Sequence, residues 1–242
     1  MSYRSDYPEY VSVAEKKEKI SKKCEKLKKK NPDIAPVVIK GSRLAATWWG
    51  KAWNVNLESY SDYSNRMPRG RSYIRHGAVL DLKIYPGKVT ALVQGSKAKP
   101  YVINIDITSL PNNTWETIIK SCEGKIESLQ ELLDGKFPKA LAELFTTRNK
   151  GLFPSPKEIS LNCSCPDWAS MCKHVAAALY GVGARLDENP ALFFVLRNVN
   201  IDDLVSKAIA QKSEALLKKS SKKTKRVIKD DDVSSMFDIE LQ

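Results

Sequence analysis

The chain has 242 residues, 42% of them hydrophobic, so it can bury a core as one large domain or as a main domain with appendages. No run approaches the roughly eighteen apolar residues of a membrane span, and the first ten residues lack the apolar core of a signal peptide. These two observations exclude a membrane protein. They predict an intracellular protein that is cytoplasmic, or nuclear in a nucleated cell. The formal charge of +12 favours nucleic acid as partner, with an acidic protein or membrane surface second.

Residues 1–40 form a basic N-terminal segment in which eleven basic residues outnumber six acidic ones. Apolar residues recur there at helical spacing and predict an amphipathic helix over residues 13–30. These residues are Val13, Ile20, Cys24 and Leu27. The helix either packs lightly on the domain or serves as an arm that contacts phosphates. Prolines at positions 32 and 36 then mark a domain boundary.

A second helix is predicted to begin after Thr47, which is a good N-cap residue. One apolar stripe of this helix consists of Trp49, Trp53, Leu57 and Tyr60, and Trp48 lies off the stripe. Packing in the core is the expected role of these aromatic residues. Stacking on a nucleic-acid base is the alternative for Trp48.

Residues 63–76 are interpreted as a loop in which arginines alternate with aromatic rings. The arginines are Arg66, Arg69, Arg71 and Arg75, and the rings are Tyr63, Tyr73 and His76. Guanidinium groups fork onto phosphate oxygens, and aromatic rings stack on unpaired bases, so this stretch is the best candidate nucleic-acid surface inside the domain. Pairing of the arginines with carboxylates of the domain, or plain solvation of a loop, is an equally weighted alternative.

Three strands with alternating hydrophobicity follow, and they predict an antiparallel meander with one buried face. The residues on that face are Leu80, Leu82 and Ile84, then Val89, Ala91 and Val93, then Tyr101, Ile103, Ile105 and Ile107. Pro86-Gly87 suits a type II turn, which predicts a bulge or a connection longer than two residues. Residues 111–147 carry three apolar helical stripes and predict a small helical bundle. The fold class is therefore α+β.

The most specific motif lies within residues 161–175, where Cys163, Cys165, Cys172 and His174 follow one another. Residues two apart on an extended segment point the same way, so the first two thiols share one side, and Pro166 favours that extended backbone. The other two ligands converge only where a loop gives way to a helix, and the alanine-rich run from Val175 predicts such a helix.

Three thiolates and an imidazole form a ligand set that binds zinc in a tetrahedron. The net charge of about −1 is stabilised by a helix N-terminus and by Lys173. Because protein side chains fill all four positions, one structural zinc ion is predicted, with no place for a reacting water. Buried ordinary cysteines and an iron–sulfur ligand set are the alternatives.

This Cys-x-Cys, six residues, Cys-x-His pattern resembles the SWIM-type zinc finger. Upstream residues extend the resemblance to the stand-alone SWIM proteins of microbes, which often accompany a Swi/Snf-type helicase-like ATPase. They are Thr47-Trp48-Trp49-Gly50-Lys51-Ala52-Trp53, Arg69-Gly70-Arg71-Ser72-Tyr73, Val93-Gln94-Gly95-Ser96 and Pro100-Tyr101. The resemblance covers about residues 41–206. It implies zinc binding, a nucleic-acid or protein interaction role and no catalytic activity.

The C-terminal part begins with Gly181 and Gly183, which predict the fraying or end of the zinc-site helix. A segment starting at Asn189-Pro190 is expected to pack on the finger, and a last helix is predicted from Ile201 to about Lys218. From Lys207 to Asp230 nine basic residues face two acidic ones, which predicts a disordered basic tail. The acidic, apolar end at 231–242 either folds back on the lysines or docks on a partner.

These patterns predict four parts: a basic N-terminal arm at 1–40, an α+β domain at 41–147, the SWIM-type finger region at 148–206 and a basic, then acidic tail at 207–242. The predicted function is a non-enzymatic, zinc-binding module for nucleic acid, with DNA favoured, that acts beside a helicase-like ATPase. Its predicted contacts are Arg66, Arg69, Arg71, Tyr73, Arg75 and Lys173. No membrane or small-molecule substrate is expected. The alternative is a protein-interaction adaptor without nucleic-acid contact.

Overall fold

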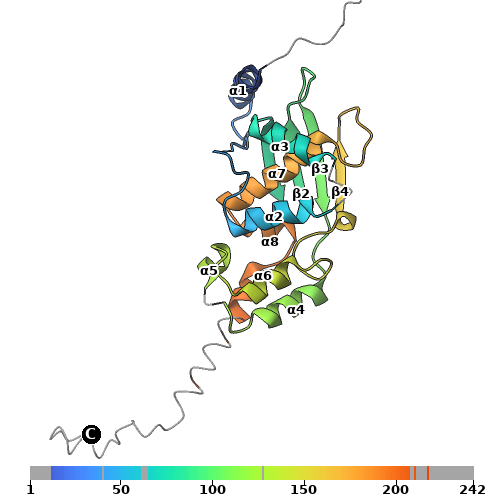
Figure 1. Ribbon diagram of the computed structural model, residues 1–242. Helices are drawn as coiled ribbons and strands as arrows, with labels where there is room; N and C mark the ends of the chain where they lie inside the picture. Colours follow the sequence, from blue (N-terminus) through green and yellow to red (C-terminus); the bar gives the residue numbers. More distant parts are fainter. Residues whose placement is uncertain are drawn as a thin grey trace, which may run out of the picture.

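A computed structural model of the chain describes residues 12–39, 41–60, 65–126 and 128–207, together with residues 210 and 217. The helices are α1 (Val13–Lys30), α2 (Trp48–Glu58), α3 (Met67–Arg75), α4 (Asn112–Cys122), α5 (Leu129–Leu133), α6 (Lys139–Thr146), α7 (Lys173–Glu188) and α8 (Ala191–Leu196), with a 3-10 helix, η2 (Pro156–Glu158). The strands are β1 (Val79–Tyr85), β2 (Lys88–Val93), β3 (Tyr101–Ile107) and β4 (Ile159–Cys163). Figure 1 shows α1 at one end of the molecule and α4, α5 and α6 at the other. The predicted α+β class is confirmed.

The sheet is an antiparallel meander in the order β1-β2-β3-β4. The three predicted strands are its first three members, and their inward faces are buried as expected except at Ile84, which is half-buried. The fourth strand, β4, pairs with β3 and places Cys163 opposite Ile103. The cysteine-bearing strand of the zinc motif is therefore part of the central sheet. The boundaries at residues 40, 147 and 206 stay predictions.

The connection between β1 and β2 differs from the expected longer loop. Tyr85 pairs directly with Lys88, so only Pro86 and Gly87 separate the two strands. Gly87 takes a positive φ of 66°, which a residue without a Cβ adopts at no steric cost. The irregularity in this pair lies at the other end of the hairpin, between Val79 and Asp81.

The helix α7 forms the centre of the core. Twelve of its sixteen residues are buried, because the sheet, α2, α3 and α8 surround an alanine- and glycine-rich sequence that is apolar nearly all round. Gly181 and Gly183 lie inside this helix and do not end it, contrary to the sequence prediction. A Cβ at Gly181 would lie 2.6 Å from Leu82 Cδ1, and one at Gly183 would lie 2.6 Å from Asn54 Oδ1, so both glycines permit close packing.

Residues 67–75 form helix α3, and the prediction of a loop there was wrong. Pro68 stands in the first turn, where its missing N–H costs nothing, and Met67, Gly70 and Ile74 form a buried stripe at helical spacing. That stripe lies on α7. Gly70 is the point of closest approach, because a Cβ there would lie 2.5 Å from the Cβ of Ala176.

An aromatic cluster joins the central core to the α4–α6 end. Trp49 and Trp53 are fully buried, and their indole N–H groups donate to the carbonyls of Leu132 and Leu179. Trp48 is half-buried, with its ring centroid 4.8 Å from that of Phe137. All three tryptophans therefore pack within the domain, which is the role expected for the aromatic residues of this segment.

Several predictions fall on residues that lie outside the described ranges. These are the N-terminal residues 1–11, Tyr63, and most of the predicted last helix and tail, of which residues 201–207 are described and helical. The predicted helix over residues 13–30 is confirmed as α1. Among the described residues, no helix has the length and apolar character needed to cross a membrane.

The contact between Gly70 and α7 predicts that Gly70→Ala destabilises the protein. Alanine in a helix interior is favoured over glycine by about 1 kcal/mol. The added methyl meets backbone atoms of α7 at 2.7 Å, and overpacking of this kind costs about 1–3 kcal/mol. We expect a net loss in the free energy of unfolding of up to about 2 kcal/mol by denaturant titration.

The matched control is Arg69→Ala, the neighbouring and exposed position of α3. Arginine and alanine have similar helix propensities, and alanine at this exposed position does not meet α7, so the stability should stay within about 0.5 kcal/mol of the parent. A Gly70→Ala protein more stable than the parent contradicts the close α3–α7 contact.

Candidate zinc centre

The four predicted ligands come from two elements that the fold brings together. Cys163 ends β4, Cys165 follows two residues later, Cys172 precedes α7, and His174 lies in its first turn. Their ligand atoms all lie within 4.8 Å of one another. A zinc tetrahedron with bonds near 2.3 Å has ligand atoms about 3.8 Å apart, so small side-chain movements suffice to close the set on one ion.

The start of α7 is built on two of the ligands. The structure begins the helix at Lys173, slightly before the expected Val175, and makes Cys172 its N-cap. The Cys172 sulfur accepts a hydrogen bond from the Val175 N–H at 3.5 Å and lies 3.7 Å from Nδ1 of His174. A thiolate at this position is stabilised by the positive end of the helix dipole.

The imidazole of His174 is held in a narrow space between aromatic rings. Its ring centroid lies 4.5 Å from that of Tyr101 and 5.4 Å from that of Tyr73. A Cβ at Gly95 would lie 2.8 Å from His174 Nε2, so the imidazole needs a glycine there. This packing turns Nδ1 toward the sulfurs. Nε2 is buried and makes no hydrogen bond within the described ranges.

The supporting roles of Gly95 and Tyr101 follow from the structure, and the sequence analysis assigned neither of them to the zinc site. Both residues belong to the stretches that carry the family resemblance. That resemblance was the only indication of their importance in the sequence. Their function depends on the β2–β3 hairpin lying beside α7, a contact between distant parts of the chain.

The three thiols differ in acidity because they share hydrogen bonds. The Cys163 thiol donates to the Cys172 sulfur, and this bond, with those from His174 and the Val175 N–H, lowers the pKa of Cys172 to about 4. The same bond and burial raise the pKa of Cys163, and burial raises the pKa of Cys165. These hydrogen bonds favour the thiolate of Cys172, and the Cys163 and Cys165 thiols lose their protons when metal binds.

Residues 149–182 match the family model described as the SWIM zinc finger, and this segment contains all four ligands. By this match, residues 149–182 are referred to as the SWIM zinc finger. The ligand geometry and the family match together support one structural Zn²⁺, held by Cys163, Cys165, Cys172 and His174. The closed set of three sulfurs and one nitrogen leaves no position for a reacting water.

The chain is also similar to one known protein over a region longer than the SWIM zinc finger. The chain is 37% identical over 172 residues to the uncharacterized protein Rv2102 of Mycobacterium tuberculosis. The aligned part covers 71% of this chain and 62% of that protein, so the chain spans less than two thirds of the relative's length. No solved structure matches the chain.

The predicted nucleic-acid residues divide between two faces of α3. Arg66, Arg69 and Tyr73 lie on one face at helical spacing, and this face borders the SWIM zinc finger. Arg66 lies 3.6 Å from the carboxylate of Asp167 in the loop between the second and third cysteines. Lys173 lies with its Nζ 5.4 Å from the centroid of the Tyr73 ring.

The remaining two arginines point elsewhere and bind within the domain. Arg71 pairs with Glu58 at 2.6 Å and donates to the Tyr180 hydroxyl at 3.2 Å. Arg75 donates to the backbone carbonyl of Ser42. Arg69, by contrast, is exposed and makes no hydrogen bond or ion pair within the described residues. The structure brings Arg66, Arg69, Tyr73 and Lys173 together on one side of α3. Contact of any of the six residues with nucleic acid stays a prediction.

A further residue of the SWIM zinc finger stands out by its exposure. Trp168 lies in the loop between Cys165 and Cys172 with 98% of its surface exposed. Such a side chain offers a large apolar surface to a partner, and tryptophan is enriched among the residues that dominate interface energies. The signal in the sequence was a tryptophan between two metal ligands and away from any apolar stripe.

Removal of one zinc ligand should release the zinc ion and remove much of the stability of the folded protein. Structural zinc contributes on the order of 10 kcal/mol or more in finger peptides, so Cys172→Ser should sharply lower the melting temperature and leave less than stoichiometric zinc by elemental analysis. Cys24→Ser is the control, because Cys24 lies on α1 outside the cluster. A zinc-free parent protein contradicts the assignment.

Proton release predicts how zinc affinity depends on pH. The raised pKa values of Cys163 and Cys165 mean that both thiols are protonated near neutral pH without metal, and both give up protons when zinc binds. The apparent affinity should therefore fall by about 100-fold per unit of falling pH below pH 8, measured against a chromophoric chelator. An affinity that is flat between pH 8 and pH 7 contradicts this.

Proposed function

We propose that this chain is a non-enzymatic, nucleic-acid-binding module, with DNA favoured, that acts beside a helicase-like ATPase. The observation that carries the proposal is the basic face at the zinc-finger end of the molecule. There the exposed Arg69 borders the SWIM zinc finger, as does Arg66, which pairs with Asp167. Lys173 belongs to that segment and lies over the Tyr73 ring. The neighbouring helix α1 adds nine lysines against three glutamates.

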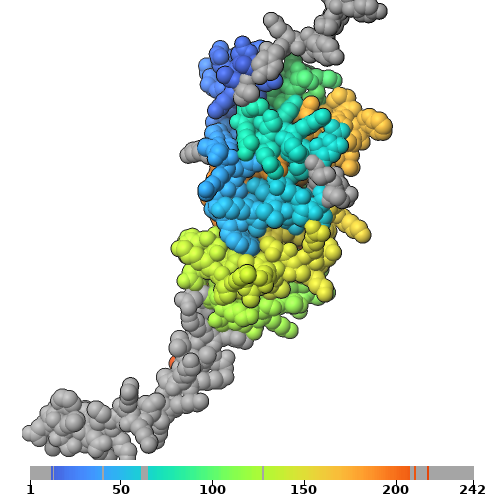
Figure 2. Space-filling view, in the orientation of Figure 1, coloured from blue at the N-terminus to red at the C-terminus, as the bar shows by residue number. Residues whose placement is uncertain are grey.

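The segments that carry these basic residues lie at the same end of the molecule. Figure 2 shows α1, in blue, next to α3, in cyan, with the yellow-orange loop of the SWIM zinc finger at that end. Clustered lysines and arginines on one face neutralise phosphates and release their counterions, which drives association without reading the sequence. Nucleic acid therefore matches the charge of this surface.

The zinc ion has an indirect role in this proposal. It fixes the first turn of α7, and α7 in turn carries α3 through the close contact at Gly70. The face of α3 with Arg69 is thereby held on a rigid support. Less conformational entropy is then lost when nucleic acid binds to this face. When bound, zinc supplies charge neutralisation and structural cross-linking only.

The part of the proposal that concerns an ATPase depends on the resemblance to stand-alone SWIM proteins. The exposed Trp168 favours a second candidate function, a protein-interaction adaptor that holds partner proteins without touching nucleic acid. The two candidates separate on one variant. Loss of a protein partner with Trp168→Ala, from a parent that binds no nucleic acid, favours the adaptor.

Binding to a labelled DNA oligonucleotide should weaken steeply with salt and with removal of charge from the basic face. We expect Arg69→Gln/Lys173→Gln to lower affinity and to reduce the slope of log K against log salt by about 0.7–0.9 for each phosphate that the variant no longer neutralises. The matched control is Lys51→Gln/Lys139→Gln, which removes two exposed lysines of α2 and α6 away from this face.

Fluorescence anisotropy at several salt concentrations measures both quantities. The control pair should bind nearly as the parent does at each salt concentration. Absence of binding to DNA and RNA, or an affinity that does not change between low and moderate salt, contradicts the proposed function.

A further inference from the structure

A groove of about 690 Å³ lies between α1 and the end of α3. The side chains that give it its chemistry are Lys16, Lys19 and Lys23 of α1, Tyr73 and His76 of α3, and Gln94 after β2. Its volume falls within the range of small-ligand sites, about 300–1,000 Å³. The three segments are distant in sequence, so only the folded chain forms this groove.

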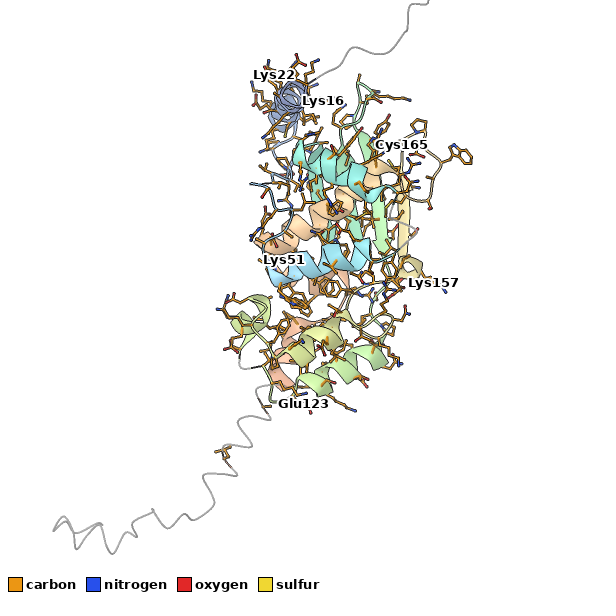
Figure 3. All side chains as sticks on the ribbon, in the orientation of Figure 1. Lys16, Lys22, Lys51, Glu123, Lys157 and Cys165 are labelled. Atoms are coloured by element: carbon orange, nitrogen blue, oxygen red, sulfur yellow. The ribbon has the colours of Figure 1, made fainter. Side chains whose placement is uncertain are left out.

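The positive charge of the groove comes from one face of α1. Lys16, Lys19 and Lys23 follow one another at spacings of three and four residues, and so lie on the same side of the helix as Ile20. Glu18 and Glu25 fall on the opposite side, where Glu18 pairs with Lys22 at 2.6 Å. Figure 3 shows Lys16 on the side of α1 toward the domain and Lys22 on the far side. No acidic residue lines the groove among the described residues.

The opposite wall of the groove is aromatic. Tyr73 and His76 are half-buried and three residues apart, so both rings lie on the same side of α3. Ile20 and Ala78 add apolar side chains to the lining. Aromatic rings beside apolar side chains accept the flat face of an unpaired base, and stacking of this kind contributes about 1–3 kcal/mol per base.

One hydrogen bond fixes the position of α1 beside the groove, and the pKa of His76 reflects the positive charge around it. The ammonium of Lys23 donates to the carbonyl of Ala98 in the β2–β3 connection, which ties α1 to the sheet at one end of the groove. Burial, followed by the nearby Lys16 and Lys17, lowers the pKa of His76. The histidine is therefore neutral at physiological pH. An anionic group bound in the groove would offset the positive charge of the nearby lysines.

We propose that this groove binds single-stranded nucleic acid, with phosphates on Lys16 and Lys19 and an unpaired base against Tyr73 and His76. The inference rests on the proposed function and adds the strandedness and the place of binding. A duplex keeps its bases stacked inside, and its major groove accepts a protruding helix. This site is a recess between a basic wall and an aromatic wall, which matches an unpaired strand.

The test compares binding of a labelled single-stranded oligothymidylate with binding of a duplex of equal length. We expect the parent to prefer the single strand. Lys16→Gln/Lys19→Gln should weaken single-strand binding about tenfold, and His76→Ala about fivefold. The control is Lys22→Gln/Lys29→Gln, which removes the same charge from the outward side of α1, and its affinity should stay within about twofold of the parent.

A second readout does not depend on affinity. Oligonucleotides carrying 5-iododeoxyuridine should cross-link on irradiation to Tyr73 or His76, as located by peptide mass spectrometry. Cross-links at Trp168 alone overturn the inference, because they place the base on the zinc-finger loop.

The outcomes also separate the inference from the proposed function. Equal affinity for duplex and single strand, or equal losses in the two lysine pairs, overturns the groove as the binding site and leaves nucleic-acid binding intact. Absence of all nucleic-acid binding overturns both. Binding of a polyglutamate peptide that requires Lys16 and Lys19, from a protein that binds no single strand, overturns the inference in favour of an acidic protein partner.

Discussion

Metal coordination and core packing meet in the first turn of α7. Cys172 caps this helix, His174 lies one residue inside it, and from Val175 onward almost every side chain is buried. A zinc ion that binds both residues therefore fixes the start of the helix around which α2, α3 and the sheet are packed. Of the remaining two ligands, Cys163 ends β4 and Cys165 follows two residues later, so the same ion joins the central helix to the sheet edge.

The close packing around α7 explains how a site for one ion influences a distant surface. Gly70 and Gly181 allow α3 and the sheet to approach the helix closely, and larger side chains at these positions would push the elements apart. The position of α3 is thus set by α7. Arg69 and Tyr73 lie on the outer side of α3. Their positions therefore depend on the first turn of α7, which the zinc ion fixes.

The charges of this protein divide into internal pairs and a basic surface. Arg71 and Arg197 form ion pairs with Glu58 and Glu158 inside or at the edge of the domain, where they stabilise the arrangement of helices. Lys16 and Lys19 of α1 and the exposed Arg69 are available to a partner. The division shows why net charge alone identifies no binding site: arginines of one short segment, 66–75, serve both purposes.

Patterns that depend on neighbouring residues were predictable from the sequence, and contacts between distant segments were not. The zinc ligands, the alternation in β1 to β3 and the helix α1 all follow from local spacing. The arginine-rich segment at α3 was wrongly predicted as a loop because its short buried stripe, Met67, Gly70 and Ile74, becomes visible only against α7.

Long-range contacts also explain the other differences. Gly181 and Gly183 have the sequence signature of a helix end, and they are retained inside α7 because Leu82 and Asn54 approach them closely. The pairing of β4 with β3, and the groove between α1 and α3, each join segments that are more than thirty residues apart.

Hydrogen exchange of the backbone amides with and without zinc tests the central claim most directly. Removal of the ion should reduce protection first and most in residues 173–177 and in the α3 segment 67–75, because the fixed start of α7 holds both. Equal protection of these two segments in the zinc-bound and chelated protein would contradict the account, since it would show that α7 and α3 keep their places without the metal.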